Sequence, residues 1–269
     1  MNFSSVTGFV AAFFIFMVTV LNSLHDPRAL LNQHALVFVV GGTLASALIA
    51  FSSRKLLGLL RSVFRFMILG EKTDPQQIVQ DLVALSKAAR THPTMFESQL
   101  NAVTHPFLRD AGRVLFWVRA DVAPEELRRT LEMRAASLYK ERISEANTAK
   151  ILAKFPPAFG LMGTTVGMIE LLQGLGTSGD PKAFLGKSMS VALMATLYGL
   201  ALANFLFIPI GESLTKQAKE SQLVHAMIIE GIMLIQANKP SRYIEEHAKS
   251  FLSPDQRKDV DQGDLAESA

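Results

Sequence analysis

Cysteine is absent from the 269-residue sequence. Its absence excludes disulfides, thiol catalysis and metal sites built on thiolates. Nucleotide-binding signatures are also missing, because the chain has neither a G-x-x-x-x-G-K-[ST] segment nor a strand-linked G-x-G-x-x-G. The six histidines form no close-spaced set, and no H-E-x-x-H motif occurs. We therefore expect no enzyme, no metal site and no cofactor, and neither an ATP-driven pump nor an intramembrane metalloprotease.

A large basic patch is missing as well. The lysines and arginines of the polar regions are interleaved with acids, and the net charge is only +3. Proteins that bind nucleic acid cluster their basic residues on one face. Nucleic acid is therefore not an expected partner.

Long apolar runs, in contrast, are plentiful. Four stretches, at residues 6–24, 34–51, 155–173 and 189–210, are apolar throughout most of their length. At a rise of about 1.5 Å per residue, each can cross a hydrocarbon core of roughly 30 Å. The first stretch lacks both the basic start and the small-residue cleavage site of a secretory signal, so we expect it to be retained. The sequence predicts an all-α polytopic membrane protein with four transmembrane helices.

The basic residues are unevenly distributed between the predicted loops. Of the 27 lysines and arginines, only Arg28, Lys182 and Lys187 lie in the two short links between spans. The other 24 lie between residues 54 and 154 or after residue 215. Because basic residues stay on the cytoplasmic side, both termini and the large loop are expected to be cytoplasmic.

The predicted organisation has five parts. Residues 1–51 form transmembrane helices 1 and 2, and residues 52–154 form a cytoplasmic helical domain that opens with an interfacial amphipathic helix at 52–69. Residues 155–210 form transmembrane helices 3 and 4, residues 211–252 a cytoplasmic helical extension, and residues 253–269 a flexible tail. The helix at 52–69 alternates basic and apolar residues at helical spacing, which is typical of a helix in the headgroup layer. A dedicated ligand-binding role is the alternative.

Prolines mark the helix boundaries of the large loop. Asp74-Pro75 predicts a helix start, and that helix stops before His92-Pro93. A second helix is expected to begin near Glu97, and His105-Pro106 interrupts it. A third begins at Pro124 with acids in its first turn. No breaker follows as far as residue 154, so this helix is expected to run straight into the third span.

Small residues recur at four-residue spacing inside the predicted spans. In lipid, such residues let helix backbones approach closely. The pairs are Gly41 with Ala45, Gly42 with Ser46 and Gly163 with Gly167, and Ala195, Gly199 and Ala203 form a stripe on the fourth span. We expect tight helix packing, either within the chain or between copies.

Polar residues inside the spans are few. Thr164 and Thr165 lie in the third span and Thr196 in the fourth. Each hydroxyl can bond the carbonyl four residues earlier, which is a structural role, or it can face a cavity and replace part of an ion's hydration shell. The spans hold one carboxylate, Glu170, near the outer end of the third. An ion path normally needs an intramembrane carboxylate, so we expect the missing one to come from another subunit.

These residues resemble a known family. PPAFGLMGTTVGM followed by ALMATLYGLALANFLFIPI is similar to the third and fourth spans of the MotA/PomA family of flagellar motor stator proteins, and GGTLASALIAF resembles the second span. The resemblance implies five copies of this chain around two copies of a single-span MotB/PomB-type partner. That partner would supply the ion-binding aspartate, and flow of H+ or Na+ would turn the ring against the rotor protein FliG. The bacterial inner membrane is the implied location.

The resemblance also assigns roles to individual positions. Pro157 and Pro209 match hinge prolines at the cytoplasmic ends of the third and fourth spans. Thr164 and Thr196 match ion-pathway threonines of the sodium-type members, with Thr165 beside them, and this favours sodium as the coupling ion. Two residues match the charges that meet the rotor: Arg90, and Glu97 with a spacing one residue shorter than usual. Glu170 stands where the family usually has an apolar residue.

Two other function classes are open at this stage. An ExbB/TolQ-like energiser of outer-membrane processes also surrounds a single-span partner, but typically has three spans. A self-sufficient secondary transporter would show inverted repeats or paired broken helices, and neither is visible in the sequence.

Overall fold

The computed structural model describes residues 32–68, 75–118, 122–174 and 181–254, with isolated positions between 7 and 22 and at 257. Within these residues the regular structure is entirely helical, which confirms the all-α prediction. The predicted first span falls on residues that are largely outside the described part of the chain. So does most of the predicted tail after residue 254.

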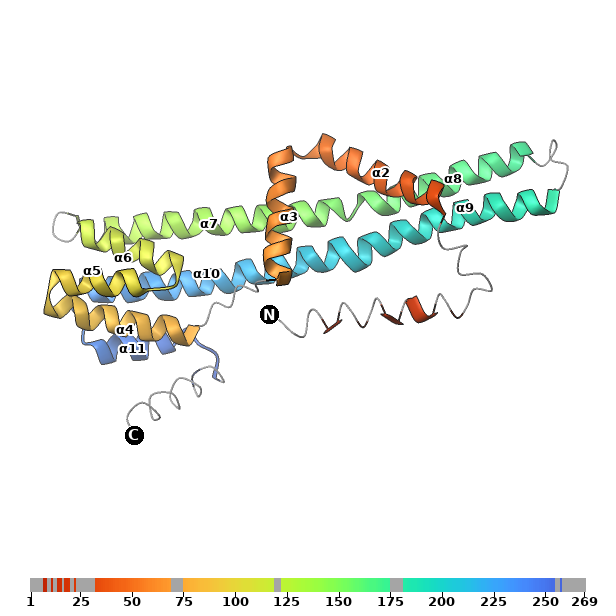
Figure 1. The fold of residues 1–269 in the computed structure, drawn as a ribbon. Coiled ribbons are helices and arrows are strands. Elements are labelled where there is room, and N and C mark those ends of the chain that lie inside the picture. Colours follow the sequence, from red (N-terminus) through yellow and green to blue (C-terminus); the bar gives the residue numbers. More distant parts are fainter. Residues whose placement is uncertain are drawn as a thin grey trace. The chain divides into compact units, whose positions relative to one another are not determined.

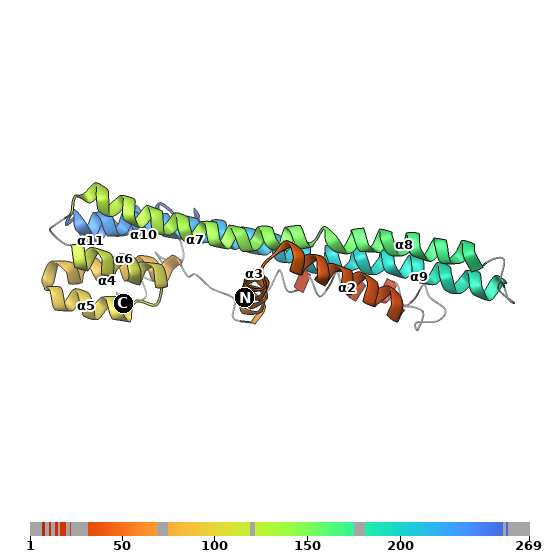
Figure 2. The same cartoon turned by 90° about the horizontal axis from the view of Figure 1, so that it is seen from above.

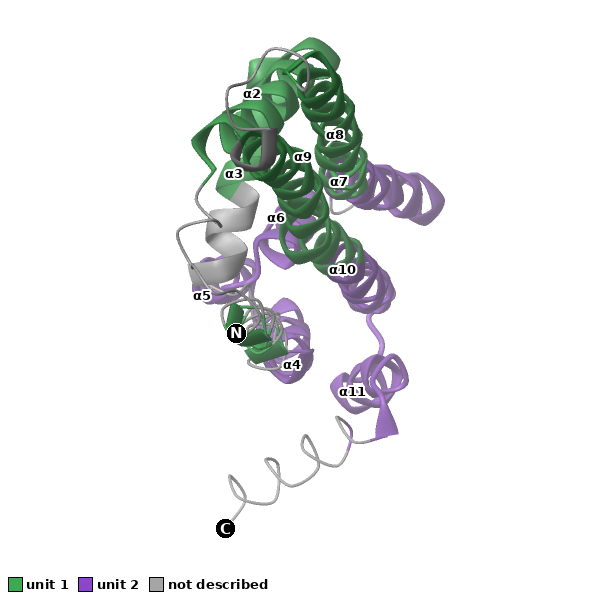
Figure 3. Cartoon of the chain, turned by 90° about the vertical axis from the view of Figure 1, so that its right-hand side faces the viewer, with its two compact units in different colours: residues 1–71, 143–215 green, residues 72–142, 216–269 purple. Residues whose placement is uncertain are grey.

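The chain forms two compact units, each assembled from two separate stretches of sequence (Figure 3). The first unit comprises residues 1–71 and 143–215, and the second comprises residues 72–142 and 216–269. The boundaries at 142/143 and 215/216 fall inside long helices, namely α7 (Pro124–Leu152) and α10 (Ile208–Gln236).

The first unit contains the apolar helices. They are α2 (Gln33–Ala50), α8 (Phe155–Gly174) and α9 (Pro181–Leu202), and α3 (Ser53–Ile68) follows α2. Helices α8 and α9 lie side by side, and α2 packs against both (Figures 1 and 2). In the described residues, three helical stretches are long and apolar enough to cross a membrane: 33–50, 124–174 and 184–236. They contain the second, third and fourth predicted spans.

The expectation that the helix from Pro124 runs unbroken into the third span is wrong in one detail. Helix α7 ends at Leu152, and a turn at residues 153 and 154 precedes α8. The cause lies in the two prolines that follow. Pro156 and Pro157 have no N–H, so the carbonyls of Leu152 and Ala153 lose the donors that would continue the helix.

A second irregularity stands just before Pro209. Residues Ala203–Phe207 form a π-helical segment, η2, and the N–H of Ile208 bonds the carbonyl of Ala203 five residues earlier. A proline ring clashes with the carbonyl four residues before it. The wider π-helical turn accommodates this, and such turns are common at functional sites.

The contact between α8 and α9 depends on glycine. A Cβ added to Gly199 would lie 2.5 Å from the carbonyl oxygen of Pro156, and one added to Gly163 would lie 2.6 Å from the Cβ of Ala195. One added to Gly167 would lie 2.8 Å from the Cβ of Ala192. The small-residue stripes of the third and fourth spans therefore pack against each other within one chain, which is one of the two arrangements that the spacing allowed.

The second unit has its own apolar core. It is built from α4 (Pro75–Thr91), α5 (Pro93–Ala102), α6 (Pro106–Val118), α11 (Ser241–Lys249) and the adjoining parts of α7 and α10. The predicted starts at Pro75 and Pro124 are confirmed, but α5 begins at Pro93, four residues before Glu97. His92 caps this helix, because its Nδ1 accepts a hydrogen bond from the N–H of Thr94.

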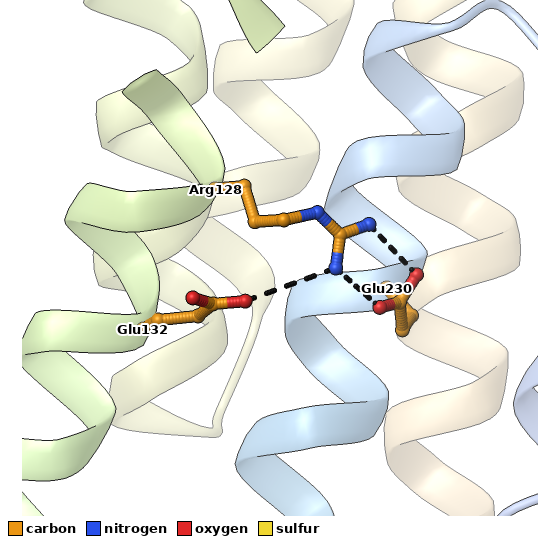
Figure 4. A network of polar contacts seen from close by, with 3 residues as sticks. All are labelled: Arg128, Glu132 and Glu230. Atoms are coloured by element: carbon orange, nitrogen blue, oxygen red, sulfur yellow. Dashed lines mark hydrogen bonds and ion pairs between the residues drawn. The ribbon is translucent and has the colours of Figure 1, made fainter. Parts of the chain in front are cut away.

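An ion pair joins α7 to α10 inside the second unit (Figure 4). The guanidinium of Arg128 meets Glu230 in a bidentate arrangement, with Nη1–Oε1 and Nη2–Oε2 distances of 2.5 and 3.1 Å. Glu132, one turn along α7, lies 3.9 Å from the same Nη1. Fork-to-fork pairing of this kind fixes orientation as well as distance, so it sets the register of the two helices.

The glycine contact gives a first prediction. In Gly199→Ala the new Cβ meets the Pro156 backbone, whereas in Gly41→Ala nothing lies within 4 Å of it. Both changes gain about the same helix propensity, roughly 1 kcal/mol, so the difference between them isolates the clash. We expect overpacking of ~1–3 kcal/mol to lower the thermal unfolding midpoint of the detergent-solubilised full chain for Gly199→Ala. Equal midpoints for the two variants would contradict the close contact.

A second prediction concerns Asp81 in α4, which is 9% exposed. Its Oδ1 accepts from Gln77, 3.1 Å away, while no hydrogen-bond partner for Oδ2 occurs in the described part of the chain. Burial raises the pKa of Asp81, and the hydrogen bond from Gln77 opposes that shift.

A carboxyl whose pKa is raised by folding stabilises the folded state at low pH, and this contribution is lost as pH rises through the folded pKa. We therefore expect Asp81→Asn to raise the unfolding free energy at pH 7 by on the order of 1 kcal/mol. The gain should shrink as the pH falls toward the ordinary aspartate pKa of about 4. Chemical unfolding of the full chain at several pH values measures this, and a gain that does not vary with pH would rule out the ionisation of Asp81 as its cause.

Candidate functional site

The two predicted ion-pathway threonines meet between α8 and α9. The Oγ1 of Thr164 lies 3.1 Å from the carbonyl oxygen of Gly160 and 3.1 Å from that of Ala192. The Oγ1 of Thr196 lies 3.3 Å from the same Gly160 oxygen, and the two hydroxyls contact each other. Both residues are partly exposed. The first unit thus gathers oxygen atoms from both helices at one place.

This cluster contains more acceptors than donors. It has four oxygen atoms but only two hydroxyl hydrogens, because each threonine supplies one. The two hydrogens cannot satisfy every close contact at once, so the hydroxyls have alternative bonding arrangements. Oxygens from hydroxyls and backbone carbonyls are also the groups that replace an ion's water shell in selective pores. The cluster therefore has the oxygen types of a cation site, although it carries no charge of its own.

Thr165 does not join this cluster. Its Oγ1 donates to the carbonyl of Leu161, 3.0 Å away in its own helix. The side chain is exposed on a face of α8 that also carries Leu161, Met168 and Leu172. This is the structural arrangement of a helix threonine, and the geometry separates Thr165 from Thr164.

Two further polar residues of α9 lie near helix interfaces and were not singled out as site residues from the sequence. The hydroxyl oxygen of Tyr198 accepts a hydrogen bond of 3.0 Å from the N–H of Asn32, the residue that caps α2. Ser188 is 2% exposed, and its Oγ has no hydrogen-bond partner among the residues described. The sequence did contain a signal for Tyr198, because it lies in a span two positions after Thr196 and the hydroxyl of a buried tyrosine usually finds a hydrogen-bond partner.

Glu170 lies apart from the threonine cluster. It follows Thr164 by six residues of regular helix, which at 3.6 residues per turn puts it on another side of α8. Its side chain is exposed. No group of three or more His, Asp or Glu residues that could hold a metal ion occurs in the described ranges.

The two prolines predicted to be hinges, Pro157 and Pro209, follow residues that pack in one small apolar cluster. Phe155, just before the α8 prolines, and Phe207, just before Ile208 and Pro209, pack against the same buried residues of the first unit. Those residues are Ala47, Leu59, Ala146, Ala149, Leu152 and Leu214. Lys150 and Glu212 form an ion pair of 3.1 Å nearby in sequence. We call α7–α8 and α9–α10 together the helix pair. The break between α7 and α8 therefore lies at the same level of this pair as the π-helical segment before α10.

Arg90 lies in the second unit, at the end of α4. Its Nη2 donates a hydrogen bond of 2.7 Å to the carbonyl of Asn238. Asn238 has a φ of 52° and ends α10 in a Schellman arrangement, because Lys239 N–H bonds Leu234 and Asn238 N–H bonds Ile235. Arg90 thus joins the end of α4 to the end of α10.

A groove of about 660 Å³ opens beside Arg90. It is lined by residues at the end of α4, the start of α5 and the end of α10, with Leu115 from α6. Glu97 is exposed on α5 and is not among the lining residues. The structure therefore puts Arg90 at a groove and places Glu97 outside it.

Comparison with known proteins identifies relatives of this chain. Residues 94–227 match the model of the MotA/TolQ/ExbB proton channel family. Motility protein A of Borreliella burgdorferi is 29% identical over 258 residues, which cover 96% of each chain. Chemotaxis protein PomA of Vibrio alginolyticus is 26% identical over 261 residues, covering 96% of this chain and 98% of that protein.

A solved structure, that of C. jejuni MotAB, shares the fold. It superposes with a TM-score of 0.83 at 22% identity and covers 95% of this chain and 97% of its own. The similarity extends over nearly the full length in both sequence and structure. The chain therefore belongs to the MotA/TolQ/ExbB proton channel family and, within it, to the MotA/PomA group.

Proposed function

We propose that this chain is a stator subunit of the bacterial flagellar motor and performs no chemical catalysis. The observation that carries the proposal is the full-length similarity to motility protein A and PomA. That similarity includes the two helices between which Thr164 and Thr196 meet. An ExbB/TolQ-like role is less well supported, because the near-full-length relatives named above are motility proteins rather than energisers.

The proposed ion path needs a second protein. Helices α8 and α9 supply neutral oxygens at the threonine cluster, and the only carboxylate in them is Glu170, on another side of α8. A single-span partner of the MotB/PomB type would supply the missing aspartate, with five copies of this chain around two of the partner. The name of the C. jejuni complex, MotAB, supports such a pairing.

Ion flow supplies enough free energy for mechanical work. A unit charge that crosses a potential of roughly 150 mV releases about 3.5 kcal/mol, at ~2.3 kcal/mol per 100 mV. In the proposed mechanism, Pro157 and Pro209 let the helix pair bend at the level where both helices are already irregular. Arg90, with Glu97 nearby on α5, would contact the rotor protein FliG and transmit the torque.

The topology completes the proposal. Four transmembrane helices cross the inner membrane, the first of them at residues 6–24. Both termini and the large loop between the second and third spans face the cytoplasm, which the distribution of lysine and arginine favours.

Motility and partner capture test the function together. A strain that lacks this chain should lose swimming and regain it when the chain is returned. The purified chain should carry with it a single-span protein that has an intramembrane aspartate. A chain that purifies alone, while its loss leaves swimming intact, would disprove the stator assignment.

The threonine cluster gives a third prediction. Thr164→Ala removes one hydroxyl ligand, which typically contributes ~1–2 kcal/mol, so ion affinity should fall by roughly 5- to 30-fold. Swimming speed should then need a higher concentration of the coupling ion to reach its half-maximum. Thr164→Ser keeps the hydroxyl and should preserve most of the affinity.

Thr165→Ala is the matched control, because among the described residues the Thr165 hydroxyl bonds only the carbonyl of Leu161 in its own helix. If Thr164→Ala and Thr165→Ala shift the ion dependence equally, the cluster is not part of the path.

The coupling ion is the subject of a fourth prediction. Because hydroxyl and carbonyl oxygens suit a partly dehydrated metal cation, we propose sodium in preference to the proton. Swimming should stop when sodium is replaced by potassium and continue when the proton gradient is collapsed with sodium present. The reverse result would assign proton coupling while leaving the stator role intact.

A further inference from the structure

Helix α3 lies across the helix pair of the first unit rather than along it (Figure 1). It follows α2 after only two residues, crosses the direction of α8 and α9 in Figure 1 and is seen nearly end-on in Figure 2. One side of α3 is packed: Leu59 is 6% exposed and Leu56 is half-buried, both in the apolar cluster with Leu152 and Leu214. A helix that crosses a spanning bundle just after a span ends has the orientation of the membrane surface.

The side of α3 away from this cluster is open within residues 53–61, where the structure describes the side chains. Leu57 and Leu60 are each 65% exposed, although they are large and apolar. Arg54, Lys55 and Arg61 are exposed on the same helix. The sequence of α3 contains no acid, and in the part of the chain that the structure describes no ion pair involves these three cations. The surface thus combines exposed apolar groups with positive charge.

We propose that α3 is a binding surface for anionic phospholipid. Leu57 and Leu60 insert at the boundary of the acyl chains, and Arg54, Lys55 and Arg61 bind the phosphates of neighbouring headgroups. Charge complementarity identifies the occupant, since the inner leaflet is anionic and attracts basic segments next to a span. The inference rests on the membrane placement within the proposed function, and not on the rotor or the coupling ion.

The position of α3 gives this binding a consequence. Its packed side belongs to the same apolar cluster as Leu152, the last residue of α7, and Leu214, five residues after Pro209. These residues flank the two irregular points of the helix pair. Lipid that holds α3 at the membrane surface therefore also fixes the depth at which the helix pair bends.

Lipid binding to the purified complex of the full chain with its partner tests the proposal. Phosphatidylglycerol and phosphatidylcholine with identical acyl chains are titrated into detergent solution, and bound lipid is counted by native mass spectrometry. The test variant is Arg54→Gln with Lys55→Gln and Arg61→Gln. The matched control removes three other exposed cations, with Arg113→Gln, Arg129→Gln and Lys140→Gln.

We expect the wild type and the control to prefer phosphatidylglycerol. The α3 variant should lose about a hundredfold in affinity for it, from roughly fivefold for each basic residue near an anionic surface. The single change Arg61→Gln should lose about fivefold, which keeps the test valid if the triple variant folds poorly. Phosphatidylglycerol should also slow hydrogen exchange of the backbone amides of residues 53–61.

Three results would overturn the proposal. In the first, the α3 variant binds phosphatidylglycerol as tightly as the control does. In the second, phosphatidylcholine binds as well as phosphatidylglycerol. In the third, inorganic phosphate displaces the lipid completely, which would mark a site for a free anion. None of these results depends on swimming. If the purified complex binds lipid as expected but loss of the chain leaves swimming intact, the proposed function is refuted instead.

Discussion

The close approach of α8 and α9 is the contact on which the functional geometry depends. Hydrophobic burial does not drive helices together in lipid, so their separation is set by the size of the residues between them. Here Gly163, Gly167 and Gly199 leave no room for even one more carbon atom. Only at this separation can the hydroxyl of Thr196 on α9 reach the carbonyl of Gly160 on α8, 3.3 Å away. The packing of small residues therefore makes the oxygen cluster.

Backbone irregularity is concentrated where that packing ends. The first residues of α8 still pack closely against α9, because Gly199 faces the carbonyl of Pro156. Immediately beyond, α7 ends in a turn and η2 widens into a π-helix. Proline is the cause on both helices, because it removes a donor and displaces a carbonyl. The first unit thus pairs a close helix contact at the threonine cluster with an irregular backbone level next to it, and α3 packs at that level.

The sequence alone was sufficient for features that arise from local rules. Apolar length located α2, α8 and most of α9, and proline located the starts of α4 and α7. Features that need a contact distant in sequence were not predictable in the same way. The bond from Arg90 to Asn238 and the bond from Asn32 to Tyr198 join residues 148 and 166 positions apart. The early start of α5 was missed because histidine is not a usual cap, although His92 acts as one here.

The threonine cluster lacks the full negative charge that an intramembrane ion site normally has. Its four oxygens are neutral, and their two hydrogens already have partners within the cluster. A cation that enters must displace those bonds and gains no full negative charge in return. Placing an ion in hydrocarbon is costly unless a carboxylate is close, and Glu170 is on a different side of α8. In the proposed function, the intramembrane aspartate of a single-span partner would bring this charge to the cluster.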